Sequence, residues 1–246
     1  MLKKRLITAL TFNNGILYRT RSFVPDYRYT KNFIDTWSVD EIIVLDITRN
    51  KKKISNIFLE NLKLISKNCF VPICAGGKIK SVEDVNLYLK SGADKISINT
   101  EAFLNPELVK KITDIYGTQV LTLSIDVKKI QKKYEIFINN GQQRVNISLE
   151  DYIYKMQKIG IGEILINSID RDGTLEGYDL TLLKLIKEIS TVPVISIGGA
   201  GNWKHFFEAV SIASIDAVAT NNIYHFTENS IINAKNYLKK NGLNFR

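Results

Sequence analysis

The chain has 246 residues, of which 45% are hydrophobic and 24% are charged, and its formal net charge is +9. This is the composition of an ordinary globular protein that can bury a full core, and the length suits one α/β barrel. No apolar run reaches the roughly 18 residues that a membrane-spanning helix needs, so we expect no membrane partner.

The positive charge is spread over predicted helix faces, and its one dense run is Lys51, Lys52 and Lys53. Nucleic-acid-binding proteins cluster their basic residues on one face, so we expect no nucleic-acid partner, while an anionic small molecule remains a candidate ligand. Cys69 and Cys74 stand near no other metal-ligand residues. They indicate a reduced, cytoplasmic protein, and we expect neither a metal nor a cofactor.

Short runs rich in Ile, Val and Leu alternate with helical patterns along the whole chain. The expected strands are 5–12, 41–47, 70–75, 95–99, 119–126, 163–168, 193–198 and 215–220. The expected helices are 30–37, 55–67, 81–91, 106–116, 148–160, 179–190, 203–213 and 228–240. Continuous apolar strands suit a parallel sheet that is buried on both faces. The alternation predicts a single (β/α)8 barrel domain over residues 1–246. The alternative, an open doubly wound sheet, lacks its usual G-x-G-x-x-G after the first strand.

The sequence repeats itself in halves. DEIIVLDITRN resembles GEILINSIDRDG, VPICAGGKI resembles VPVISIGGAGN, and ADKISIN resembles IDAVATNN, at offsets of 121 or 122 residues. A constant offset of this kind predicts two half-barrels related by a two-fold axis. One interruption follows the fifth strand, where residues 134–138 and an Asn-Gly turn predict a small hairpin above Asp126.

The strand ends carry glycines and small polar residues that suit phosphate binding. Backbone N–H groups of glycine-rich loops and of helix starts converge on anions. The candidate residues are Gly76, Gly77, Lys78, Asn99, Thr100, Gly198, Gly199, Asn221 and Asn222. Two such loops related by the repeat predict a ligand with a phosphate at each end, whereas a single loop would be consistent with an ordinary turn.

Acidic residues stand at other strand ends. Asp46 ends the second strand, and Asp170, Asp172 and Gly173 follow the sixth, so we expect them in the same site. Asp126 ends the fifth strand and is the candidate general acid or base. When RLITALTF is laid over LTLSIDV, the two-fold mate of this acid falls at Thr11, whose hydroxyl does not ionise usefully near neutral pH.

Four charged residues stand at the starts of strands, at the opposite end of the barrel. They are Arg5, Glu41, Lys95 and Glu163. Two cations and two acids at the floor of a barrel predict a closed ring of salt bridges. The alternative is that each is a solvated charge at the start of its strand.

These residues together resemble the cyclase subunit family of imidazole glycerol phosphate synthase, of histidine biosynthesis. The matching pieces are KRLI, DEIIVLDIT, GADKISINT, INSIDRDGTLEGYD, GGAGN and the HF of NIYHF, and they span the whole chain. The resemblance implies a (β/α)8 barrel that binds a bis-phosphorylated ribonucleotide at its top. It also implies a heterodimer with a glutaminase docked at the floor, whose ammonia crosses the barrel.

The resemblance assigns roles to individual residues. Asp126 matches one of two catalytic aspartates, and Asp94 matches a residue that faces the glutaminase. The charged gate of the ammonia route matches Arg5, Glu41, Lys95 and Glu163. Phosphate-site positions match Asn99, Thr100, Asp172, Gly173 and Gly199.

The departures from the family pattern lie on the substrate face. Thr11 replaces the other catalytic aspartate, Lys78 replaces a glycine, and Asn221 and Asn222 stand where small residues are usual. The pattern resembles that of paralogues in surface-polysaccharide synthesis, where the barrel passes ammonia to an amidotransferase acting on an N-acetyl sugar. We therefore expect such a paralogue. The alternatives are a genuine cyclase of histidine biosynthesis or another phosphate-binding barrel enzyme, such as a sugar-phosphate isomerase.

Overall fold

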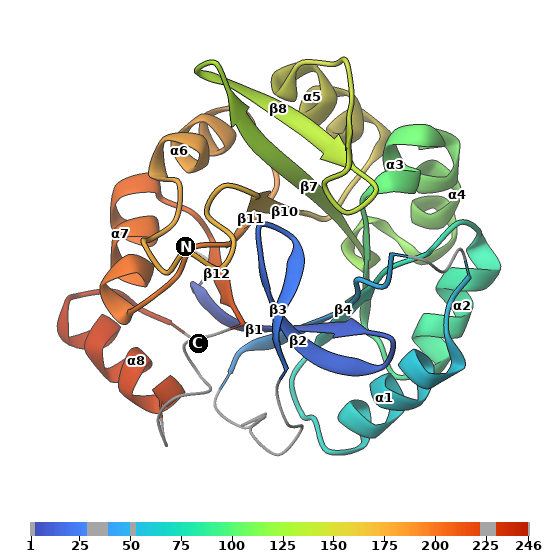
Figure 1. Cartoon of the computed structure of the whole chain (residues 1–246), viewed down its shortest axis with the longest axis horizontal. Helices are drawn as coiled ribbons and strands as arrows, with labels where there is room; N and C mark the ends of the chain where they lie inside the picture. The colour runs from blue at the N-terminus through green and yellow to red at the C-terminus, as the bar shows by residue number, and fades with distance from the viewer. Residues whose placement is uncertain (1–2, 29–38, 50–52, 222–229, 246) are drawn as a thin grey trace.

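The computed structural model describes residues 3–28, 39–49, 53–221 and 230–245. A ring of helices surrounds a central set of strands (Figure 1). Asn222, the helix expected at 30–37 and the first residues of the helix expected at 228–240 lie outside the described residues. Within those residues, no helix is both long and apolar enough to pass through a membrane.

The central strands pair in parallel and close into a barrel, which confirms the predicted (β/α)8 fold. They are β1 (Arg5–Asn13), β4 (Glu41–Asp46), β5 (Ile73–Gly76), β6 (Lys95–Ile98), β7 (Leu121–Ile130), β10 (Glu163–Ser168), β11 (Val194–Ile197) and β12 (Ala217–Thr220). Pairing of β12 with β1 and of β7 with β10 completes the circle, so no barrel strand has a free edge.

The helices follow the strands and cover the outside of the barrel. They are α1 (Asn56–Lys67), α2 (Val82–Lys90), α3 (Thr100–Leu104), α4 (Pro106–Tyr116), α5 (Leu149–Ile159), α6 (Leu180–Ile189), α7 (Trp203–Ala213) and α8 (Ser230–Lys240). Side chains at Ser81, Ser148, Asp179 and Asn202 accept hydrogen bonds from the first turns of α2, α5, α6 and α7. These caps satisfy backbone donors and fix where each helix starts after its strand loop.

Each barrel strand is buried on both faces, as the continuous apolar runs predicted. Outward side chains such as Leu6, Leu10 and Val44 pack under the helices. Inward side chains form a separate cluster on the barrel axis, made of Ile7, Ala9, Ile43, Cys74, Leu165, Ile195, Ala217 and Ala219.

Inward side chains of alternate strands lie in layers across the barrel axis. The pairing registers give the sequence of layers on β4, β6, β10 and β12. From floor to mouth they are Glu41, Lys95, Glu163 and Ala217; then Ile43, Ser97, Leu165 and Ala219; then Leu45 and Asn167, with Asn99 and Asn221 directly after the ends of β6 and β12. The topmost layer on the other strands contains Thr11 and Asp126, on opposite sides of the axis. Charge therefore lies at the two ends and small or apolar side chains lie between.

A hairpin after the first strand is an element that the sequence analysis treated as a loop. β2 (Ile16–Arg21) pairs with the end of β1, and β3 (Val24–Arg28) pairs with β2, all antiparallel. Asn13 pairs with Ile16, so the turn is Asn14-Gly15, and both residues have positive φ, 51° and 77°. Asn-Gly is a strong signal for a two-residue hairpin turn.

The inserted segment after the fifth barrel strand also differs from its prediction, in the strand with which it mainly pairs. β8 (Lys133–Ile138) does form a small hairpin with β9 (Gln143–Arg144) across the predicted Asn-Gly turn. Its longer pairing, however, is with an extension of β7 to Ile130, through a turn at Gln131 and Lys132. The sequence ended the fifth strand too early, because the polar residues after Asp126 belong to a two-stranded ribbon of β7 and β8 that extends beyond the central strands (Figure 1).

The turn between β7 and β8 generates a stability prediction. Lys132 has a φ of 71°, a conformation that costs a non-glycine residue roughly 1–2 kcal/mol. We expect Lys132→Gly to raise the free energy of unfolding by up to about 1 kcal/mol after the entropy cost of glycine, measured by urea denaturation. The neighbouring Lys133→Gly, in β8, is the matched control and should lower it. An equal loss in both variants would contradict the argument.

Candidate functional site

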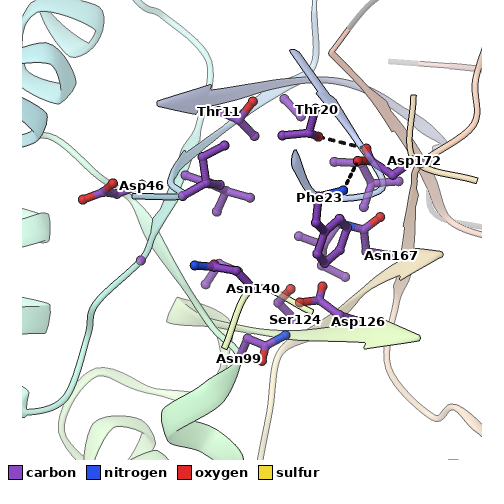
Figure 2. A pocket seen from close by; sticks show the side chains of 18 of the residues that line it. Thr11, Thr20, Phe23, Asp46, Asn99, Ser124, Asp126, Asn140, Asn167 and Asp172 are labelled. Carbon is purple, nitrogen blue, oxygen red and sulfur yellow. Dashed lines mark hydrogen bonds between the residues drawn. The ribbon is translucent and has the colours of Figure 1, made fainter. Parts of the chain in front are cut away.

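A cavity of about 560 Å³ opens at the carboxyl ends of the barrel strands. The predicted site residues that line it are Thr11, Asp46, Gly77, Lys78, Asn99, Thr100, Asp126, Asp172, Gly173, Gly198, Gly199 and Asn221. They come from strand ends and loops far apart in the sequence, and Figure 2 shows Thr11, Asn99, Asp126 and Asp172 around one cavity. The expected convergence of strand ends therefore brings most of the predicted residues together.

Two predicted residues in the described part of the chain are not part of the cavity wall. Gly76 is buried inside β5, where an added Cβ would lie 2.5 Å from the carbonyl oxygen of Ser97. Asp170 is exposed and accepts a hydrogen bond from the backbone N–H of Lys129 at 2.7 Å, so it ties β10 to the extended β7. Asn222 lies outside the described residues.

The glycine loop after β5 approaches the neighbouring strand closely. Gly77 has a φ of 114°, and a Cβ there would lie 2.5 Å from the carbonyl oxygen of Asp46. Lys78 follows in a left-handed conformation, with a φ of 60°. Its Nζ donates to the backbone carbonyl of Thr48. Burial lowers the pKa of Lys78, although the charge of Asp46 opposes this. The ammonium group is therefore held against the wall of the cavity.

The second glycine loop, after β11, is held by backbone contacts of its own. Gly198 and Gly199 have φ values of 94° and 104°. Gly199 accepts a hydrogen bond from Gly177 N–H at 2.7 Å, and its missing side chain leaves room for that contact. The N–H of Gly201 donates to Nδ1 of His205 at 3.1 Å. This loop presents backbone at the cavity, as an anion site requires.

Asp126 lies on the cavity wall with 8% of its surface exposed. The pKa of Asp126 is raised to about 8, chiefly by burial and also by the charge of Asp172, while a hydrogen bond from Asn99 opposes the shift. A carboxyl group with a pKa near the working pH is suited to general acid or base chemistry. The geometry thus leaves Asp126 with a proton to give at neutral pH.

Thr11 lies across the axis from Asp126 and is buried. Its hydroxyl donates to the backbone carbonyl of Tyr18 in β2 and accepts from Nδ2 of Asn221 at 3.0 Å. The same Nδ2 donates to the Tyr18 carbonyl at 3.1 Å. The hydroxyl is therefore committed to the β1–β2 hairpin and supplies no acid or base to the cavity.

Asp172 fastens the hairpin over the cavity. One carboxylate oxygen accepts from the Thr20 hydroxyl at 3.0 Å, and the other accepts from the N–H of Phe23 at 2.8 Å (Figure 2). Arg49 donates to the carbonyl of Phe23 at 2.6 Å. These contacts explain why a partly buried acid stands in the loop after β10: it holds the hairpin as well as facing the cavity.

Several cavity residues were missed by the sequence analysis. They are Arg19, Thr20 and Phe23 on the hairpin, Arg49 and Lys80 in loops, Ser97, Ser124 and Asn167 on strands, and Asn139 and Asn140 in the β8–β9 turn. The Asn14-Gly15 turn could have signalled the hairpin. Ser97, Ser124 and Asn167 were visible as polar residues inside otherwise apolar strands, a signal that the search at strand ends passed over.

At the floor, the four charged residues form a closed ring of ion pairs, here called the floor ring. Arg5 contacts Glu41 at 2.6 Å and Glu163 at 2.8 Å, and Lys95 contacts Glu41 at 3.2 Å and Glu163 at 3.0 Å. Burial raises the pKa of Glu41, with both cations opposing it. Burial lowers the pKa of Lys95, but the two carboxylates outweigh it and raise the pKa overall. The two carboxylates likewise raise the pKa of Arg5 overall, so both cations of the ring are held charged.

Asp94 precedes Lys95 at the same end of the barrel and is exposed. One of its carboxylate oxygens accepts from the N–H of Ile73 at 2.8 Å. This places a fixed, outward-facing acid beside the floor ring.

Comparison with known proteins gives one consistent result. Residues 21–230 match the family described as histidine biosynthesis protein. The chain is 37% identical over 253 residues to the imidazole glycerol phosphate synthase subunit HisF of Clostridium botulinum, covering 100% of both chains. It is 35% identical to the same subunit of a Thermotoga species over 100% of this chain and 98% of the relative. It is 39% identical to that of Dictyoglomus turgidum over 99% of this chain and 98% of the relative.

The raised pKa of Asp126 predicts a pH-dependent stability. The folded-state pKa of about 8 lies above the ordinary value of 3.8, so between these values the native state keeps a proton that the unfolded chain has lost. Stability therefore falls as pH rises through this range. We expect Asp126→Asn to make the free energy of unfolding less dependent on pH in this range, as measured by urea denaturation from pH 5 to pH 8. Parallel curves for the two proteins would contradict the assignment.

The floor ring predicts a large stability loss when one member is removed. Glu41→Ala leaves two cations to share Glu163, and we expect it to cost about 3–5 kcal/mol. The matched control is Glu135→Ala, which removes the partner of Arg144, a side chain that is 53% exposed, and should cost less than about 1 kcal/mol. Comparable urea midpoints for the two variants would show that the ring does not behave as a buried ion-pair network.

Proposed function

The chain belongs to the histidine biosynthesis protein family, and from that premise we propose that its barrel receives ammonia from a glutaminase subunit and delivers it beyond its own mouth. The glutaminase docks at the floor, beside Asp94, in a heterodimer. The relatives bear the name of imidazole glycerol phosphate synthase, a name that supports the glutaminase partner. The departure from those relatives lies in what happens to the ammonia at the mouth.

The floor supports the proposal because its charged residues close the barrel reversibly. The ring has two salt bridges to each acid, and all its pairs lie between 2.6 and 3.2 Å. A cation that swings away from one acid keeps the other, so the ring opens without leaving a buried charge unpaired. Such a ring suits a gate that admits a small neutral molecule.

The middle of the barrel supports the proposal through the size of its side chains. Above the ring, inward positions are occupied by Ala219, Ala9, Gly76, Ser97 and Ser124 among larger residues. An eight-stranded barrel is just wide enough for large side chains to fill it. Small ones leave room for a molecule the size of ammonia.

The observation that carries the proposal is the state of Thr11. Cyclase chemistry in this family is expected to use two carboxylates, and here the second position holds a hydroxyl that is hydrogen-bonded to Tyr18 and Asn221. Losing one member of a cooperating acid–base pair costs several powers of ten in rate. A barrel that only passes ammonia on does not need that group.

The acceptor we propose is a third protein, an amidotransferase that acts on an N-acetyl sugar in surface-polysaccharide synthesis. This follows the resemblance of the departures at Thr11, Lys78 and Asn221 to those of such paralogues. The two glycine loops retain the backbone geometry for a phosphorylated small molecule, which we propose as a ligand of the same cavity.

A second candidate is a genuine imidazole glycerol phosphate synthase cyclase. The observation that favours it is Asp126, which faces the cavity with a pKa raised to about 8, as a general acid requires. In that case the remaining carboxyl would have to perform both proton transfers.

The two candidates predict different activities. We expect the barrel to stimulate a partner glutaminase but to turn over the ribonucleotide substrate of histidine biosynthesis, supplied with ammonium chloride, at least about a thousandfold more slowly than a HisF relative. Thr11→Asp should recover part of that turnover if the phosphate sites are intact. The matched control is Thr11→Asn, which has the same shape as aspartate and no ionisable group, and it should recover none.

Normal turnover by the unmodified chain would reject the conduit proposal and establish the cyclase. Absence of any effect on glutaminase activity, together with no detectable association with the glutaminase, would reject both candidates.

A further inference from the structure

Three exposed apolar side chains surround the opening of the cavity. Val24 is 51% exposed, Leu104 is 58% exposed and Leu175 is 40% exposed. They belong to the segments that follow β1, β6 and β10, and no two of these strands are neighbours in the barrel. Leu104 and Leu175 line the cavity, and Val24 follows Phe23, which also lines it. We call the three side chains the apolar rim.

The backbone of Leu175 is held in a costly conformation at this exposed position. Its φ is 64°, in the left-handed region, which is unfavourable for a bulky side chain. The N–H of Gly177 donates to the carbonyl of Gly199 at 2.7 Å, and a Cβ on Gly201 would lie 2.1 Å from the carbonyl oxygen of Leu175. Strained residues cluster at functional sites. The fold thus holds an apolar side chain at the opening instead of burying it in the core.

A ligand inside the cavity does not account for the whole apolar rim. Val24 is more than half exposed and is not a lining residue, so a small molecule in the cavity would leave it in water. A body broad enough to lie across the opening would cover all three side chains at once. Apolar groups that surround one opening mark an interaction site, whereas exposed hydrophobic residues scattered singly need no explanation.

The ribbon of β7 and β8 adds a basic edge to the same end of the molecule. Residues 128–133 contain four lysines and no acid. All four are exposed: Lys128, Lys129, Lys132 and Lys133. Ile130, at the end of β7, lies about 13 Å along the strand from Asp126. An ordinary protein interface buries about 800 Å² on each partner, a patch about 32 Å across. The lysines therefore lie at the edge of a patch of that size centred on the cavity.

Contacts to the barrel hold the ribbon in place. Asp170 accepts a hydrogen bond from the backbone N–H of Lys129 at 2.7 Å. The hydroxyl of Tyr134 donates to the two carboxylate oxygens of Asp179 at 3.0 and 3.1 Å, and Asp179 caps α6. The Nζ of Lys129 lies 5.4 Å from the centre of the Tyr134 ring. An anchored ribbon loses less conformational freedom on binding than a mobile segment does.

We propose that the apolar rim and the four ribbon lysines form the docking surface for the acceptor protein, which presents an apolar patch edged by acidic residues. Interfaces combine an apolar centre with a polar rim, and complementary charge orients the partners as they meet. The inference rests on the proposed function, because only a barrel that delivers ammonia beyond its mouth needs a protein there.

Docking at the rim has a chemical purpose. Ammonia that escapes into water at neutral pH takes up a proton and loses its nucleophilic lone pair. A protein seated on the apolar rim excludes that water and joins the cavity to the acceptor's own active site. A membrane surface also attracts lysines, but it offers no active site to receive ammonia.

The binding test uses the heterodimer of the barrel with its glutaminase, and the N-acetyl-sugar amidotransferase as the probe. The Kd is measured by biolayer interferometry at about 50 mM and about 300 mM sodium chloride. We expect Leu104→Glu to raise the Kd at least about tenfold, because it places a carboxylate in the apolar centre opposite an acidic partner. The matched control is Leu87→Glu, on the outside of α2, where the leucine is 45% exposed. It should leave the Kd unchanged.

The lysines are tested by their salt dependence. Lys132→Glu combined with Lys133→Glu should raise the Kd mainly at the lower salt concentration, because charges at the edge of an interface act over a distance that salt screens. The difference between the two salt concentrations should therefore shrink in this double variant.

Val24→Glu separates docking from effects inside the cavity, because Val24 does not line it. We expect glutamine-dependent amidation of the sugar to fall at least about tenfold, while amidation by the same amidotransferase with added ammonium chloride stays the same. If either glutamate variant fails to fold, Leu104→Ala and Val24→Ala replace it, with a smaller expected effect in the same direction.

Equal Kd values for the unmodified heterodimer, Leu104→Glu and Leu87→Glu, or no binding of the amidotransferase, would overturn the inference. So would a Leu104→Glu variant that loses only self-association on size-exclusion chromatography, or only binding to phosphatidylglycerol vesicles, since the rim would then serve a second copy or a membrane. The proposed function has its own readout. Glutaminase stimulation and glutamine-dependent amidation that persist in all these variants would keep the function and lose this docking surface.

Discussion

Closure of the barrel between β12 and β1 is the constraint on which the rest of the structure depends. Once the strands form a circle, inward side chains from distant parts of the sequence share layers across one axis. Glu41 and Glu163 become neighbours of the same two cations, and Thr11 comes to face Asp126. An open sheet with the same strands would bring neither set together. The floor ring and the cavity, at the two ends of the barrel, therefore both result from its closure.

The two ends differ in how their polar groups are satisfied. At the floor, every charged member contacts two opposite charges, so the ring is complete within the chain. At the mouth, Asp46, Asn99, Asn167 and Asn221 each retain a buried oxygen with no partner in the described part of the chain. A complete network gives stability and a defined closed state. An incomplete network lowers the stability of the empty protein, and a bound ligand offsets this by donating the missing hydrogen bonds. Binding sites commonly show this compromise.

The sequence predicted the barrel because its two strongest signals are local: apolar runs of strand length and the repeat at a constant offset. Asp126, Gly77, Gly198 and Gly199 line the cavity as expected, because strand ends converge in any such barrel, whereas Gly76 does not. Asn167 was missed, since the residues that come together inside a barrel are defined by register between strands, which local patterns do not encode. The β1–β2–β3 hairpin was missed for another reason. The Asn14-Gly15 turn was visible, but its strands are short and polar, so their periodicity was weak.

The described positions at which the resemblance implies a departure from the family pattern share a physical feature at the mouth. Thr11 and Asn221 both donate to the carbonyl of Tyr18 in the hairpin, and Lys78 donates to the carbonyl of Thr48 in the loop after β4. Each of these three side chains therefore donates a hydrogen bond to a backbone carbonyl of the chain itself. A carboxylate at position 11 would instead face the Tyr18 carbonyl, and a glycine at position 78 would leave Thr48 without this donor. Under the proposed function these side chains serve to fix the loops around the cavity. A barrel that keeps its shape and its floor, and passes ammonia on, requires no proton transfer from them at its mouth.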